Sequence, residues 1–172
     1  SRTLDIDQLL HQILDLIFQW VACDRGCIML HDEVHNEWKA SARRNRQPQG
    51  TSTMEISRTI LDYVIERREG ILTENAGDDS RWSASASIAQ AGIREAICVP
   101  MQGRYGIVGA IYIDTSRSLR EFAQADQQRI FDTEHLQLMV AIGHQAALAI
   151  EDTYYYRGML QAERLAVMGQ TI

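Results

Sequence analysis

The sequence lacks any apolar run near the roughly 20 residues that cross a bilayer, and its first residues show no secretory signal. It also lacks a basic excess, since 17 Lys and Arg stand against 23 Asp and Glu, for a formal net charge of −6. Nucleic-acid-binding domains carry a basic stripe, so this balance argues against a nucleic-acid partner. We expect a cytoplasmic domain without a membrane span, preceded by further sequence upstream of Ser1.

Cysteine is scarce, with only Cys23, Cys27 and Cys98. A chain of 172 residues can bury a core without disulfide bonds, and an odd number of cysteines favours reduced thiols. No second pair of Cys or His accompanies Cys23 and Cys27 at the spacing of a zinc site, so the sequence predicts no metal site. Free cysteine is usually buried, and we expect Cys27 and Cys98 to be core residues on central strands. The alternative is a thiol that lines a pocket or senses redox state.

Hydrophobic residues make up 45% of the chain and charged residues 23%, the mixture of an ordinary globular domain. Apolar residues recur at helical spacing from Asp5 to Val21, whereas residues 38–43 alternate strictly between apolar and polar, as a half-exposed strand does. Read in the same way, the chain predicts a helix at 5–21, a hairpin of strands 25–30 and 38–43, a helix at 57–68 that Gly70 stops, a strand at 71–73, a short helix at 83–91, and a second hairpin of strands 96–101 and 107–113.

The last predicted helix begins at Glu134, with Asp132 or Thr133 as its cap, and runs on without a proline. At the rise of an α-helix it would be roughly 50 Å long or more, well beyond the diameter of a single domain. Its outer half therefore needs something to pack against. We divide the chain into a folded domain at 1–152 and an extended helix at 153–172.

Five segments resemble, in order, the motifs of a known family. Residues 24–30 resemble its first strand, and residues 75–82 resemble its Asn-x-x-x-Asp-x-Arg-Phe loop, with Trp in place of Phe. Residues 96–101 resemble its "VPL" strand, residues 109–114 its "G-x-L-Y-L-D" strand, and residues 131–136 the "F-T-x-E-D-L" opening of its last helix. In this order they resemble a GAF domain, the small-molecule sensor module of many signalling proteins.

The resemblance implies an α+β fold of the GAF/PAS type, with an antiparallel sheet of five or six strands. The terminal helices would cover one face of the sheet, and the pocket helices the other. Such a domain has no catalytic residues of its own, and the sequence identifies no cofactor. A free-standing GAF-like enzyme, such as a methionine sulfoxide reductase, would need reactive thiols in the pocket loop, and residues 75–91 contain no cysteine.

The same resemblance implies a ligand-binding set, consisting of Asn75, Asp79, Arg81, Trp82 and Cys98. Arg81 could pair with an anionic ligand and Trp82 could stack on a planar ring. The structural alternatives are a pair between Arg81 and Asp79, and a Trp82 that packs under its loop. Cyclic-nucleotide-binding GAF domains have Lys after the Asn and Asp-Glu downstream of the Phe. This chain departs from both, which argues against cGMP or cAMP as the ligand.

The tail, Glu163–Ile172, resembles the entry to a histidine-kinase dimerisation helix. This implies a homodimer through the first and last helices, with a downstream kinase domain as output. Leu165 and Met168 have coiled-coil spacing, which makes a helical seam a hypothesis. His135 and His144 lack the flanking pattern of a phosphoacceptor. The alternatives are another output, such as a nucleotide cyclase or an ATPase-type transcriptional activator, and a connector that dimerises without a ligand.

Overall fold

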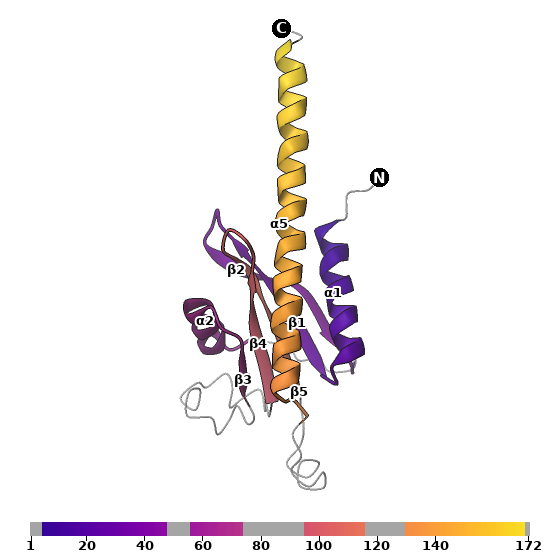
Figure 1. Ribbon diagram of the computed structural model, residues 1–172, viewed down its shortest axis with the longest axis vertical. Helices are drawn as coiled ribbons and strands as arrows, with labels where there is room; N and C mark the ends of the chain where they lie inside the picture. The colour runs from indigo at the N-terminus through magenta and orange to yellow at the C-terminus, as the bar shows by residue number, and fades with distance from the viewer. Residues whose placement is uncertain (1–4, 48–55, 74–94, 116–129, 171–172) are drawn as a thin grey trace.

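The computed structural model describes residues 5–47, 56–73, 95–115 and 130–170, with only the backbone for part of 155–170. Its centre is a sheet of five antiparallel strands in the order β2-β1-β5-β4-β3 (Figure 1). The strands are β1 (Arg25–Asp32), β2 (Glu37–Asn45), β3 (Ile71–Thr73), β4 (Glu95–Gln102) and β5 (Ile107–Thr115). Both predicted hairpins and the short strand are confirmed.

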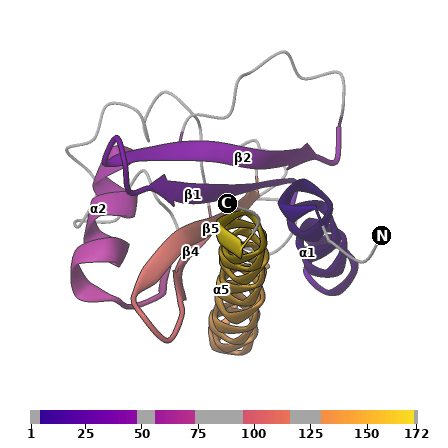
Figure 2. The same ribbon diagram turned by 90° about the horizontal axis from the view of Figure 1, so that it is seen from above.

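Helices cover the two faces of the sheet. Helix α1 (Ile6–Trp20) and helix α5 (Thr133–Gln170) lie side by side on one face, and α2 (Arg58–Arg67) lies on the other (Figures 1 and 2). The predicted fold class is confirmed, including the placement of the terminal helices together. The predicted helix at 83–91 falls outside the described residues.

The larger core fills the space between the sheet and the two terminal helices. Apolar residues at helical spacing in α1, including Leu10, Leu14 and Ile17, pack against alternate residues of the central strands. The α5 backbone comes close to β4, because a Cβ added at Gly143 would lie 2.9 Å from the carbonyl oxygen of Pro100. A side chain at this position would push the helix away from the sheet.

The ends of the helices follow local capping chemistry. The side chain of Asp5 accepts a hydrogen bond from the Asp7 amide at the start of α1, and that of Ser57 accepts one from Ile60 at the start of α2. The prediction that Gly70 stops α2 is wrong. The helix ends at Arg67, and its cap residue Arg68 adopts the left-handed conformation with φ 56°. After two more residues the chain enters β3.

Helix α5 is a single unbroken element of 38 residues, which corresponds to about 57 Å. The Asp132 carboxylate caps it by accepting a hydrogen bond of 2.9 Å from the His135 amide. Beyond Ile150 the helix leaves the sheet, and Leu165 and Met168 are 68% and 63% exposed. The prediction of one long terminal helix is confirmed. No helix in the described residues is long and apolar enough to span a membrane.

Candidate functional site

The face of the sheet that α2 covers carries a row of chemically distinctive residues. Cys27 of β1, Tyr112 of β5 and Cys98 of β4 are direct cross-strand neighbours, and all three are buried in one cluster with α2. Arg25 and Asp114 point to the same face, because side chains two positions apart on a strand share a side. They form the next row toward one end of the sheet.

Arg25 and Asp114 form a buried ion pair with two parallel hydrogen bonds. Nε of Arg25 donates to Oδ1 of Asp114 at 2.9 Å, and Nη2 donates to Oδ2 at 2.5 Å. The Tyr112 hydroxyl donates to Oδ2 at 3.0 Å. Burial raises the pKa of the Asp114 carboxyl, while the bonds from Arg25 oppose that rise. The hydrogen bond to Asp114 raises the pKa of Arg25, so the guanidinium stays charged and the pair is electrically neutral as a whole.

Thr73 of β3 lies in the same row, two strands away from Asp114 of β5. We call Arg25, Asp114 and Thr73 the polar row. Thr73 is paired across β3 with Ala96 of β4, which neighbours Asp114 on β5. Its hydroxyl is buried and has no hydrogen-bond partner among the residues that the structure describes. Buried hydroxyls nearly always find one, because leaving one without costs about 1–3 kcal/mol. A small molecule with a hydrogen-bonding group would satisfy this hydroxyl.

The three thiols are all buried and free. Burial raises the pKa of Cys23 to about 11, of Cys27 to about 11 and of Cys98 to about 12. Reactive cysteines have lowered pKa values and partial exposure. These thiols have neither, so they are of the inert, structural kind. The prediction that Cys27 and Cys98 are buried core residues is confirmed.

The raised thiol pKa values make stability depend on pH. In the unfolded chain a thiol ionises near pH 8.5–9, whereas in the fold it keeps its proton to about pH 11 or 12. The stabilisation is therefore complete below about pH 8.5 and is lost as pH rises. Urea denaturation between about pH 8 and about pH 10 should show the free energy of unfolding fall by up to about 1.4 kcal/mol per pH unit for each thiol. Cys98→Ala should make the decline shallower, and a flat profile would contradict the assignment.

Four members of the predicted ligand-binding set, Asn75, Asp79, Arg81 and Trp82, lie outside the described residues. The fifth, Cys98, lies on β4 beside Tyr112, in the face of the sheet that α2 covers. We call this face the floor of the candidate site. The segment with the other four begins after Thr73 and ends before Glu95, at the end of the sheet that carries the polar row. The sequence did not assign a role to Arg25, Asp114 or Tyr112. The available signal was that Arg25 and Asp114 each stand near an apolar run of strand residues, 27–30 and 110–113.

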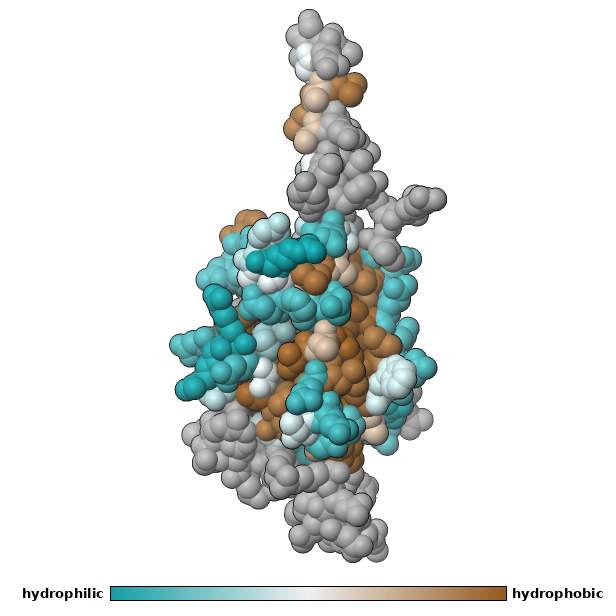
Figure 3. Space-filling view, viewed as in Figure 1, coloured by the Kyte–Doolittle hydropathy of each residue, from teal (hydrophilic) through white to brown (hydrophobic). Residues whose placement is uncertain are grey.

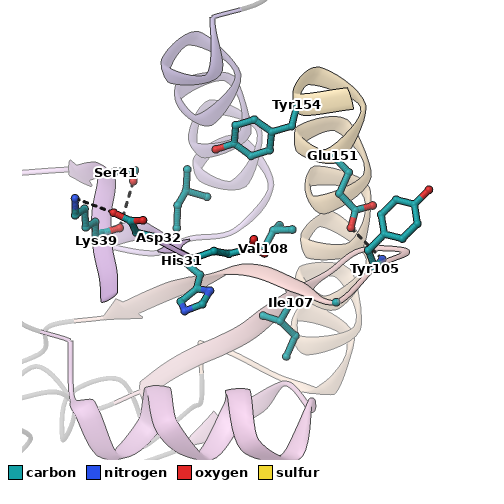
Figure 4. A pocket seen from close by; sticks show the side chains of 12 residues that line it. His31, Asp32, Lys39, Ser41, Tyr105, Ile107, Val108, Glu151 and Tyr154 are labelled. Atoms are coloured by element: carbon teal, nitrogen blue, oxygen red, sulfur yellow. Dashed lines mark hydrogen bonds and ion pairs between the residues drawn. The ribbon is translucent and has the colours of Figure 1, made fainter. Parts of the chain in front are cut away.

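A separate groove of about 720 Å³ lies at the opposite end of the sheet, where α5 leaves it (Figure 4). The β1–β2 hairpin contributes Asp32 and Lys39, which pair at 3.2 Å. Hydrogen bonds from His35 and Lys39 hold the pKa of Asp32 well below its usual range. The β4–β5 turn, the start of β5 and α5 form the other wall with Tyr105, Ile107, Val108, Glu151 and Tyr154. No sequence pattern pointed to this groove, because three separate segments build it.

The comparisons with known proteins agree with this architecture. A family model for the GAF domain matches residues 5–150. The chain belongs to the GAF domain family. The domain is therefore regulatory and sensory in type. A search of curated proteins finds no match.

Solved structures share this GAF fold at low sequence identity. The GAF domain of a two-component sensor histidine kinase from Bacillus halodurans is 16% identical with a TM-score of 0.63, covering 88% of this chain and 97% of that one. A GAF domain/HD domain protein from Geobacter sulfurreducens is 13% identical with a TM-score of 0.66, and the match covers 88% of this chain and 95% of that one. The PixJ GAF domain of Thermosynechococcus elongatus, in its blue-light-absorbing form, is 12% identical with a TM-score of 0.70, and the match covers 92% of each chain. At these identities the likeness shows the fold alone.

The GAF domain also exposes apolar side chains on its two terminal helices. Hydrophobic residues gather where α1 and α5 lie side by side (Figure 3). Leu16 and Trp20 of α1 and Leu138 of α5 are all exposed, and Trp20 is the most exposed at 65%. A contiguous apolar surface of this kind is typical of a protein–protein contact. Among the described residues, no cluster of three or more His, Cys, Asp or Glu side chains could hold a metal ion.

Proposed function

We propose that this GAF domain is the small-molecule-sensing and dimerisation domain of a two-component sensor histidine kinase, and that α5 relays its signal to the kinase. The observation that carries the proposal is the continuity of α5. One helix packs on the sheet through Met139 and Ile150 and then continues for some twenty residues (151–170) with exposed Leu165 and Met168. On this proposal residues 1–152 form the sensor and residues 153–172 the signalling helix.

The sensing face would be the α2 side of the sheet. The polar row provides an ion pair and, at Thr73, a buried hydroxyl without a partner in the described part of the chain, at the end of β3 that leads toward Asn75. We propose that a ligand binds between this floor and Asn75, Asp79, Arg81 and Trp82, with Cys98 in the floor. Such a ligand can shift the domain only by its difference in affinity for the two states.

The dimer contact would be the terminal helices. An isolated helix is marginally stable in water without packing, and the outer half of α5 extends beyond the sheet (Figure 1) with Leu165 exposed. A second copy related by two-fold symmetry would cover Leu16, Trp20 and Leu138 and would pair the two outer halves of α5. The relay then follows, because a change in packing at the sheet would alter the angle at which the paired helices leave.

The combined substitution Leu165→Glu with Met168→Glu tests this proposal. The contact would bury four apolar side chains, each contributing about 1.5–3 kcal/mol, so the dimer should weaken by more than about 100-fold in sedimentation equilibrium. In the full-length protein, the same change should reduce transfer of radiolabelled phosphate from ATP to an acid-labile phosphohistidine.

Val34→Glu is the matched control, since Val34 is 87% exposed on the β1–β2 turn and belongs to neither terminal helix. It should leave dimerisation and phosphorylation unchanged. If the double variant dimerises as tightly as the unmodified chain, the outer half of α5 is not the seam. If the full-length protein dimerises normally but forms no phosphohistidine, the output is of another kind, such as a cyclase or an ATPase-type activator.

A further inference from the structure

The two residues just before the cap of α5 are attached to the start of β4 by a buried carboxylate. Glu95 is 1% exposed, and its side chain points to the face that carries α5. Its Oε1 accepts hydrogen bonds of 3.0 Å from the backbone amides of both Ile130 and Phe131, and its Oε2 lies 3.1 Å from the Ile130 amide. These amides lie just before the helix, where the positive end of its dipole favours a negative charge.

A second carboxylate attaches α5 to the other end of the same hairpin. Glu151 accepts hydrogen bonds from two successive backbone amides of the β4–β5 turn, at 3.0 Å from Arg104 and 3.2 Å from Tyr105 (Figure 4). The Arg104 side chain also pairs with Asp152 at 3.1 Å. In both places a carboxylate binds two adjacent amides, but here the helix supplies the carboxylate and the hairpin supplies the amides.

The two attachments match the dimensions of the elements they join. From Phe131 to Glu151 the helix advances about 30 Å, and β4 with its turn extends over a similar distance, about 26 Å for the eight residues of the strand. Between the attachments, Gly143 brings the helix backbone against Pro100, and the His144 ring lies 2.6 Å from the carbonyl oxygen of Gln102. The helix therefore cannot slide along β4 while both carboxylates are bound.

The two attachments differ in their exposure to water. The Glu95 bonds are buried or partly buried, whereas both Glu151 bonds are exposed. Hydrogen bonds to a charged group contribute more when water is excluded. The Glu95 attachment is thus the fixed end, and the Glu151 attachment is the end that can open without unfolding the domain.

We propose that Glu95 and Glu151 clamp α5 onto the β4–β5 hairpin, and that opening of the Glu151 clamp frees the outer half of α5 to change direction. The hairpin and the inner half of α5 then move as one body, with the hinge just beyond Ile150. This deepens the proposed relay, but it concerns motion within one chain and holds whatever the output domain is. Glu151 and Tyr105 also line the groove, so the clamp is open to solvent there.

Spin labels at Val34→Cys and Val167→Cys measure this directly. Both positions are exposed, at 87% and 61%, and the native thiols are buried, so the introduced cysteines are labelled selectively. Double electron–electron resonance, with labelled chains diluted in excess unlabelled chain, gives the distance distribution between the β1–β2 turn and the outer helix. Glu151→Ala should broaden this distribution at least twofold, and Glu151→Gln, which keeps one acceptor oxygen, should broaden it less.

A second variant opens the clamp without altering α5. A Cβ at Gly103 would overlap the Glu151 carboxylate, the flexible end of a side chain that can move aside. Gly103→Ala should therefore reproduce the broadening of Glu151→Ala at little cost in melting temperature. The control is Glu134→Ala, an exposed glutamate in the first turn of the same helix, and it should leave the distribution unchanged.

The proposal is overturned if both Glu151→Ala and Gly103→Ala keep the width of the unmodified chain, or if Glu134→Ala broadens the distribution equally. These outcomes are independent of the dimer test. Spin dilution makes the measured distance intramolecular, so the clamp can be confirmed even where Leu165 and Met168 prove unnecessary for dimerisation.

Discussion

Replacing Asp114 by alanine should lower the free energy of unfolding by about 3–5 kcal/mol. The Asp114 side chain is fully buried, and its removal would leave the Arg25 guanidinium charged without a partner in the floor of the α2 face. The Tyr112 hydroxyl would lose its acceptor as well. Urea denaturation at neutral pH measures the loss, with the slope of the transition as a check that the unfolded state is unchanged.

Two further variants show whether burial is the cause. Asp152→Ala removes the carboxylate of another Arg–Asp pair, the exposed one with Arg104, and should cost no more than about 1 kcal/mol. Arg25→Met combined with Asp114→Leu removes both charges and should recover much of the stability lost in Asp114→Ala, because no buried charge is left without a partner. A cost below about 1 kcal/mol for Asp114→Ala would mean that water reaches Arg25 and that the floor is not closed.

Replacing Glu95 by alanine should cost about 2–4 kcal/mol, because two backbone amides at the start of α5 lose their acceptor where water has little access. The loss of a negative charge at the helix N-terminus adds to it. The free energy of unfolding is again measured in urea. Glu95→Gln should be intermediate, since its amide oxygen still accepts from one of the two donors.

Glu134→Ala is the control for this prediction as well. It removes a carboxylate from the first turn of the same helix, but from an exposed position, so its cost should stay within about 1 kcal/mol. Equal costs for the two alanine variants would mean that the charge near the helix end matters and the bonds to Ile130 and Phe131 do not. The clamp would then lose its fixed end.

The predictions from the sequence succeeded where the chemistry is local. The 3.6-residue spacing in α1, the alternation along residues 38–43 and the absence of proline after Glu134 each depend on residues close in the chain. The cap at Asp132 was equally visible, because a helix start needs a particular residue type next to it. The stop at Gly70 failed, because Arg68 takes the left-handed conformation for which glycine is the usual choice.

The candidate site was less accessible to the sequence. Arg25 and Asp114 are 89 positions apart, and each alone looks like an ordinary strand-end charge. Only the antiparallel register of β1 with β5 brings them opposite each other. The proposed ligand-binding residues Asn75, Asp79, Arg81 and Trp82 stay predictions that rest on the family resemblance, and so does the ligand-binding role of Cys98.

By itself the sequence determined the order of the elements and the long terminal helix, because periodicity and capping are set by neighbours along the chain. The GAF architecture followed from the resemblance of its motifs to that family. Only the tertiary structure decided which charges are buried together, that Glu95 of β4 binds the amides just before α5 while Glu151 of α5 binds those of the β4–β5 turn, and where the groove lies. The reason is physical. Whether a carboxylate forms a fixed contact or an open one depends on which donors face it and how much water reaches it, and distant segments supply both.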